Sequence, residues 1–132
     1  MDLAYWKLIF TLYLVTILVE TPVLLVGLSR RHPLRHRLFA GVWLTACTYP
    51  VVGVVLPAVF DPRTERLAYL VVAETFAPAA ECLLFYLAFG QAGPRTRRAL
   101  VQDMGAVVVA NLMSFGLGEW ANEHDFFTKL PW

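Results

Sequence analysis

The chain has 132 residues, of which 58% are hydrophobic and 16% are charged, and its formal net charge is +1. Soluble domains contain roughly 45–50% apolar and about 25% charged residues, so this composition excludes an ordinary soluble domain and makes the lipid bilayer the expected partner. A net charge this small gives no general attraction to nucleic acid, and two cysteines in apolar segments do not indicate a disulfide framework.

Four apolar runs follow one another along the chain, at about residues 3–28, 38–60, 67–90 and 99–120, and a mixed aromatic tail occupies 121–132. Each run reaches the roughly 20 residues that a membrane-spanning helix needs. Runs of this length exclude a transmembrane strand barrel. The sequence therefore predicts an all-α membrane protein with a single domain of four transmembrane helices joined by short loops. The tail is expected to lie along the membrane surface or to fray.

Basic residues are distributed unequally among the loops. Arginines are frequent in loops 29–37 and 91–98, whereas loop 61–66 has fewer arginines and also carries acids. Because positively charged loops stay in the cytoplasm, we expect a multi-pass protein of the cell (inner) membrane with the first and third loops cytoplasmic and both termini outside. His32 and His36 lie among the arginines of the first loop, which disfavours a metal site, and we expect this loop to face lipid headgroups.

The two halves of the chain resemble each other. A shift of 61 positions places Glu20 on Glu81, and in each half a glutamate precedes a basic loop and a further apolar run. A polar pair in the second run also matches a polar pair in the fourth run at a different offset. These pairs are Thr45 with Thr48 and Asn111 with Ser114. The pattern predicts a tandem duplication of a two-helix hairpin.

Glu20, Glu74 and Glu81 are candidate site carboxylates because they lie inside apolar runs. Glu74, Pro78 and Glu81 share one helix face, and seven residues of helix separate the two acids by about 10 Å. A charge at the bilayer centre costs roughly 2.5–3.5 kcal/mol on insertion scales, so we expect these acids to point into the bundle. No lysine or arginine follows Lys7 inside the runs, so the acids are expected to be protonated or compensated by a mobile cation.

Other polar residues complete the candidate substrate- or ion-binding site. We expect Thr48 and Asn111 to lie near the middle of the membrane, and the side chains of Asn111 and Ser114 can hydrogen-bond the glutamates across the helix interface. Prolines inside the runs kink a helix and free a carbonyl four residues earlier, which a cation or a neighbouring hydroxyl can then use. These kink positions are Pro22, Pro50 and Pro78.

Small residues form a stripe in the fourth run, at Ala106, Ala110, Ser114 and Gly118. Steps of four residues place them on one helix face, which allows another backbone to approach closely. The stripe is expected to pack inside the bundle or against a second protomer or membrane partner.

Three functions are compatible with this pattern. The first is a transporter or channel component for protons, a cation or a cationic small molecule. The alternative is a structural or accessory subunit, in which the polar groups specify helix packing. The third is an intramembrane enzyme that uses Glu20 and Glu81 as acid and base. Phosphate-loop, H-E-x-x-H, G-x-S-x-G and CxxC motifs are absent, so no cofactor is expected and no metal can be assigned.

Overall fold

A computed structural model describes residues 3–61, 63–91 and 96–124 of the chain, and these residues form helices without any strand. Four helical spans are long and apolar enough to cross a membrane, as predicted. The elements are α1 (Leu3–Gly27), α2 (Leu34–Pro50), the π-helix η1 (Val51–Val55), α3 (Leu56–Val59), α4 (Arg66–Phe89) and α5 (Arg97–Glu123). The second span consists of α2, η1 and α3 in direct succession.

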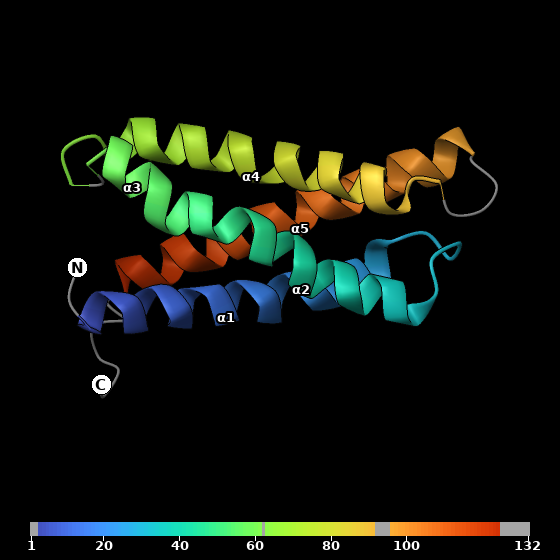
Figure 1. Cartoon of the computed structure of the whole chain (residues 1–132), viewed down its shortest axis with the longest axis horizontal. Coiled ribbons are helices and arrows are strands. Elements are labelled where there is room, and N and C mark those ends of the chain that lie inside the picture. The colour runs from blue at the N-terminus through green and yellow to red at the C-terminus, as the bar shows by residue number, and fades with distance from the viewer. Residues whose placement is uncertain (1–2, 62, 92–95, 125–132) are drawn as a thin grey trace.

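The four spans form a bundle in which α1 and α4 lie on opposite sides, with α2 and α5 crossing between them (Figure 1). Both α1 and α4 pack against α2 and α5. One end of the bundle holds the start of α1 and the loop before α4, and we call it the N-terminal end (Figure 1). The other end holds the end of α4 and the loop after α1, and we call it the loop-one end (Figure 1). Polar side chains of α1 and α4 that point to the bundle axis therefore meet those of α2 and α5.

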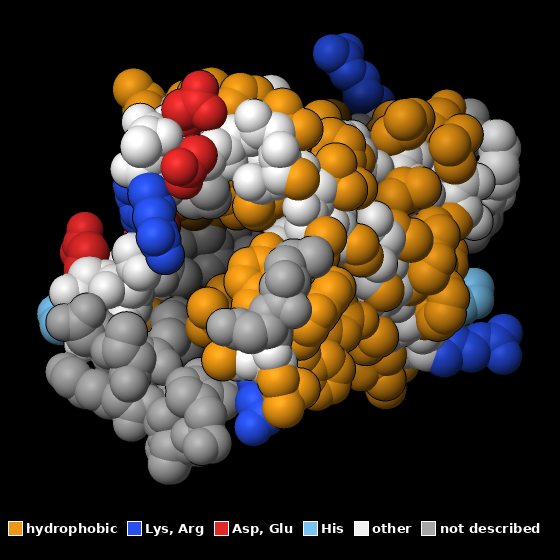
Figure 2. Space-filling model, turned by 60° about the vertical axis from the view of Figure 1, so that its left-hand side comes forward, with side chains coloured by type: hydrophobic (Ala, Val, Ile, Leu, Met, Phe, Trp, Pro, Cys, Tyr) orange, Lys and Arg blue, Asp and Glu red, His pale blue; other side chains and the backbone are white. Residues whose placement is uncertain are grey.

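The surface is largely apolar. Large apolar side chains are exposed on all four spans, among them Leu18 of α1 and Leu87 near the end of α4 at 72% and 65%, and an apolar surface of this extent is unusual for a soluble monomer. Figure 2 shows hydrophobic side chains over the flank of the bundle, with the lysine and arginine side chains near its edges. This distribution suits a hydrocarbon environment around the helices.

The buried apolar residues are concentrated towards the loop-one end. Leu24, Leu44, Phe85 and Val107 belong to one cluster contributed by α1, α2, α4 and α5, and each is no more than 1% exposed. The cluster fills the bundle between the buried glutamates and the first loop, so this end is closed by tightly packed side chains.

Two close helix crossings depend on glycine. A Cβ on Gly41 would lie 2.5 Å from the Thr21 hydroxyl oxygen, and a Cβ on Gly27 would lie 2.9 Å from the Ala106 Cβ. Larger residues at these positions would force α2 and α5 away from α1. The crossings therefore bring the polar residues of three helices within hydrogen-bonding range.

The small-residue stripe of α5 is divided between two environments. Ala106 and Ala110 are buried in the core, and Ser114 hydrogen-bonds Glu20. A Cβ on Gly118 would meet no atom of the described residues within 4 Å. The first three residues thus pack inside the bundle, and contact with a second protomer or membrane partner stays a prediction.

Helix boundaries extend beyond the apolar runs. α2 begins at Leu34 rather than at 38, and α5 covers Arg97–Glu123 rather than 99–120. The charged residues at these ends are good helix formers, and the Thr96 hydroxyl caps α5 by accepting from the Ala99 amide at 3.1 Å. Hydropathy identifies the part of a helix that suits lipid, but it does not identify the residues at which the helix begins and ends. Of the predicted tail, residues 125–132 lie outside the described residues.

A π-helix directly after Pro50 interrupts the predicted single helix at 38–60. The wider turns leave backbone carbonyls for other donors. The Tyr5 hydroxyl of α1 donates to the Gly53 carbonyl at 3.0 Å, and the Tyr69 hydroxyl of α4 donates to the Val52 carbonyl at 3.2 Å. The irregular backbone is thereby tied to both neighbouring helices.

Candidate functional site

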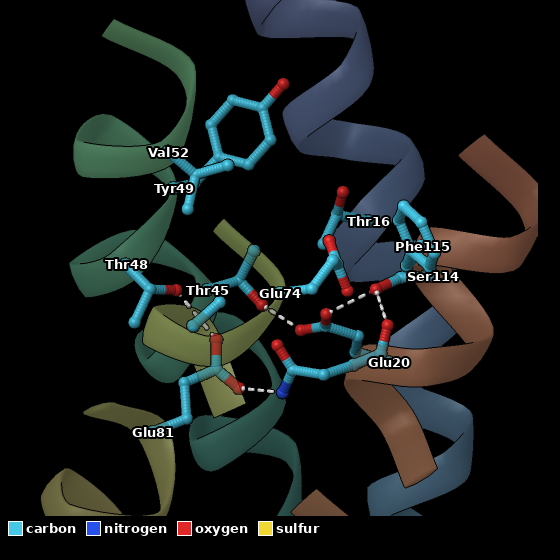
Figure 3. Close-up of a pocket in the computed structure, with 12 residues that line it drawn as sticks. Thr16, Glu20, Thr45, Thr48, Tyr49, Val52, Glu74, Glu81, Ser114 and Phe115 are labelled. Atoms are coloured by element: carbon cyan, nitrogen blue, oxygen red, sulfur yellow. Dashed lines mark hydrogen bonds between the residues drawn. The ribbon is translucent and has the colours of Figure 1, made fainter. Parts of the chain in front are cut away.

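A cavity of about 110 Å³ lies between the four spans, near the middle of the bundle. A cavity needs about 10–15 Å³ to hold one water molecule, so this one is large enough for water or for a small ligand. Figure 3 shows the side chains that surround it, contributed by α1, α2 with η1, α4 and α5. The lining residues are Thr16, Glu20, Thr45, Thr48, Tyr49, Val52, Glu74, Ala77, Glu81, Asn111, Ser114 and Phe115.

The carboxyl group of Glu20 of α1 is hydrogen-bonded by two hydroxyl groups, one from α2 and one from α5. The Thr45 hydroxyl of α2 and the Ser114 hydroxyl of α5 each lie 2.7 Å from one of its carboxylate oxygens. Glu20 is only 2% exposed, so these hydroxyls replace water as its hydrogen-bond partners. The expected contact between Ser114 and a glutamate is present.

Glu81 of α4 has an equivalent pair of partners. The Thr48 hydroxyl of α2 and the Asn111 amide of α5 each lie 2.7 Å from one of its carboxylate oxygens. Glu81 is 1% exposed. The expected contact between Asn111 and a glutamate is also present, and the two buried acids share the same two supporting helices (Figure 3).

Glu74 differs from the two buried acids. It lines the same cavity from α4 but is only half-buried. Within the described part of the chain, its carboxylate has no hydrogen bond and no ion pair. Of the three acids, Glu74 is therefore the one whose oxygens are free to contact a bound ligand.

The hydroxyl groups can satisfy a carboxyl group with or without its proton. The Thr45 hydroxyl is 2.7 Å from Glu20 but also 3.0 Å from the Gly41 carbonyl, and it has only one proton to donate. It can donate to an ionised Glu20, or accept from a protonated Glu20 and donate to the carbonyl. Thr48 and Ser114 have the same two choices. The network therefore accommodates gain or loss of a proton without moving its heavy atoms.

No lysine, arginine or histidine among the described residues lines the cavity. Among the described residues, the carboxylates thus have no basic side chain beside them at the cavity. In residues 3–61, 63–91 and 96–124, no three side chains of His, Cys, Asp or Glu lie close enough together to hold one metal ion.

The three prolines occupy different places relative to the cavity. Pro22 and Pro78 lie inside α1 and α4, one or two positions from a cavity-lining residue, and Pro50 ends α2 where the π-helix begins. Their role as cation-binding kinks stays a prediction. So does the binding role of Glu20, Glu74, Glu81, Thr48, Asn111 and Ser114.

A second polar cluster was missed from the sequence. Asp103 of α5 is fully buried and accepts from the Ser29 amide at 2.7 Å and from the Arg31 guanidinium at 2.7 and 3.0 Å. The His32 ring lies 3.0 Å from the same carboxylate. Asp103 is an acid within the fourth apolar run, so the criterion that selected Glu20 would also have selected it.

This cluster corrects the prediction that the whole first loop faces lipid headgroups. Ser29 and His32 are 5% and 1% exposed, because the loop folds inward onto Asp103. Arg37 holds the loop in this shape by donating to the backbone carbonyls of Leu25, Ser29 and His32. Arg35 remains exposed.

Comparison with protein-family models, with curated proteins and with solved structures found no match.

Proposed function

We propose that this chain is a small membrane transporter or channel component whose central cavity binds protons or a small cation. One observation carries the proposal: three carboxylates line a single cavity between membrane-spanning helices, and no basic side chain of the described residues lines it with them. An ionisable residue inside a membrane bundle is a candidate for an ion pathway or a proton relay.

The balance of energies supports this function. Each uncompensated charge in the membrane costs roughly 2.5–3.5 kcal/mol on insertion scales. A cation about 4 Å from a carboxylate recovers roughly 4 kcal/mol at an effective dielectric constant of about 20. The acids therefore either take up protons or attract a cation, and exchange between these two states is the basis of coupled transport.

The hydrogen-bond network also supports proton exchange. The hydroxyls around Glu20 and Glu81 have a backbone carbonyl as a second acceptor, so they can reverse their roles when a carboxyl group gains a proton. Glu74, half-buried at the same cavity, offers unbonded oxygens to an incoming ion.

The location is proposed with the function. The excess of arginine in loops 29–37 and 91–98 favours cytoplasmic placement of both loops in a cell (inner) membrane, with both termini outside. Four short spans around a small cavity leave little room for a continuous path, which favours a dimer or higher oligomer.

A tandem duplication accounts for the paired contacts around the two buried acids. In the two halves of the chain, Glu20 is equivalent to Glu81, and the polar pair of α2 is equivalent to the polar pair of α5. When equivalent residues are exchanged, the hydrogen bonds around one acid become the hydrogen bonds around the other. Under this exchange the bond from Thr45 to Glu20 corresponds to the bond from Asn111 to Glu81. The bond from Ser114 to Glu20 corresponds to the bond from Thr48 to Glu81.

The proposal is tested by reconstitution in liposomes. Proton flux and the uptake of small cations are compared between the wild type, Glu81→Gln and the matched control Glu123→Gln, whose side chain is exposed at the end of α5. We expect flux in the wild type and the control and its loss in Glu81→Gln. Absence of flux under every imposed gradient, with folded wild-type protein, would overturn the proposal.

The alternative is a structural or accessory subunit, and one observation favours it. Every oxygen of Glu20 and Glu81 already has a hydrogen-bond partner, as in a polar core that specifies helix packing. Glutamine can replace a protonated glutamate in such a core. Under this alternative, the Glu20→Gln, Glu74→Gln and Glu81→Gln variants fold normally and cause no loss of function in cells.

A further inference from the structure

A groove on the flank of the bundle adjoins the carboxylate cavity. It has a volume of about 370 Å³ and lies between the first half of α1 and the region where α2 passes into η1. Its lining contains no charged residue among those described. The lining residues are Trp6, Ile9, Phe10, Tyr13, Ala46, Tyr49, Pro50 and Val54. Trp6 and Phe10 are 47% and 59% exposed, so the groove is accessible from the surrounding hydrocarbon.

Tyr49 belongs to both spaces, since it lines the groove and also the cavity. Its ring centroid lies 5.5 Å from that of Tyr13, so two aromatic rings stand at the boundary between α1 and α2. In Figure 3 the Tyr49 ring lies to one side of the carboxylates, and its hydroxyl points away from Glu81. Within the described residues this hydroxyl has no hydrogen bond, so none holds the ring in place.

We propose that the groove and the cavity together form a binding site for an amphipathic organic cation. The cationic group lies in the cavity beside Glu74, and the apolar part lies in the groove. This inference rests on the proposed function and names a class of substrate for the same site.

Charge and shape both favour this ligand. The cavity presents carboxylates without a basic side chain among its described lining residues, and it is too small for more than a compact cationic group. The groove presents aromatic and aliphatic side chains to an apolar chain. The rings of Tyr13 and Tyr49 stand at the boundary of the two spaces, and an aromatic face there attracts a cationic group.

A neutral acyl chain of a membrane lipid is the competing occupant of the groove. Such a chain gains the same apolar contacts but nothing from the carboxylates. Its binding therefore does not depend on the charge of Glu74, whereas the binding of an amphipathic cation does. Glu74→Gln separates these occupants, and it removes no hydrogen bond within the described residues, so the variant is expected to fold.

The experiment measures binding to the full chain in nanodiscs of neutral phosphatidylcholine by equilibrium dialysis. The probes are octyltrimethylammonium, its neutral isostere with carbon in place of nitrogen, and tetramethylammonium. Empty nanodiscs correct for partition into lipid. We expect the wild type and Glu123→Gln to bind octyltrimethylammonium at least about tenfold more tightly than either other probe.

Two variants test the two halves of the site. Glu74→Gln should weaken octyltrimethylammonium binding about tenfold and leave the neutral isostere unaffected. Ile9→Trp, which fills the groove, should weaken octyltrimethylammonium but not tetramethylammonium. Equal binding of the cation and its neutral isostere would overturn the inference in favour of a lipid-filled groove. Tight tetramethylammonium binding with no gain from the octyl chain would overturn it while leaving the proposed small-cation function intact.

Discussion

Asp103 should contribute more to stability than any exposed charge of this protein. In Asp103→Asn the side chain keeps its shape but loses its negative charge, and Arg31, only 8% exposed, loses its counter-ion. Ser29 and His32 retain a weaker, neutral acceptor. Leaving one partner of a buried ion pair without the other costs about 3–5 kcal/mol, so we expect a decrease of this size in the free energy of unfolding.

The measurement is equilibrium unfolding in mixed detergent micelles, followed by circular dichroism. Glu119→Gln provides the matched control, because Glu119 forms an ion pair with Arg66 at 2.6 Å in which the two side chains are 32% and 48% exposed. Exposed pairs contribute about 0–1 kcal/mol. The double variant Asp103→Asn/Arg31→Met removes the unpaired cation as well, and it should recover part of the lost stability.

The reasoning would be refuted if Asp103→Asn and Glu119→Gln decreased the free energy of unfolding equally. That result would mean that water reaches Asp103 in the folded bundle and screens its charge. A double variant less stable than Asp103→Asn alone would refute the role of Arg31 as the uncompensated charge.

Two further predictions concern helix packing and orientation. Gly41→Ala should lower the free energy of unfolding by about 1–3 kcal/mol, because the added methyl group would meet Thr21. Gly118→Ala is the control, because a methyl group there meets no described atom within 4 Å. The two variants are compared by thermal unfolding in nanodiscs, and equal losses of stability would contradict the close crossing. The orientation is tested with single cysteines, Arg63→Cys and Arg35→Cys, in a cysteine-free background. A membrane-impermeant maleimide added to intact cells should label Arg63→Cys, and it should label Arg35→Cys only after the membrane is permeabilised. The reverse pattern would contradict the proposed orientation.

The sequence was sufficient for the helices and for most of the polar residues at the centre of the bundle. An apolar run of at least 20 residues can bury its backbone groups in lipid only as a helix, so the four spans follow from hydropathy. The cost of a charge in lipid likewise directs Glu20 and Glu81 inward. Their partners Asn111 and Ser114 could be identified because each lies in the middle of an apolar run and has few alternative partners there.

Other features depend on distances that hydropathy does not contain. The π-helix follows Pro50, which has no amide proton to donate to the helix. Two tyrosines, one from α1 and one from α4, donate to carbonyls of this π-helix, and the sequence does not show that these tyrosines lie close to it. Thr45 could be recognised as polar, but its contact with Glu20 requires the close approach of α2 and α1 at Gly41. Asp103 near the start of its run gave a signal, but its partners lie in a loop far away in sequence.

The contacts between helices are stronger at one end of the bundle than at the other, so the two ends should differ in flexibility. At the loop-one end, Asp103 and the apolar cluster join α1, α2, α4 and α5 through contacts shielded from water. At the N-terminal end, α4 and α5 are connected by the exposed pair of Arg66 and Glu119. Separating α4 from α5 is therefore easier at the N-terminal end, and these two helices are expected to move apart there while the loop-one end stays rigid. Amide hydrogen exchange should be fastest in the turns farthest from Asp103.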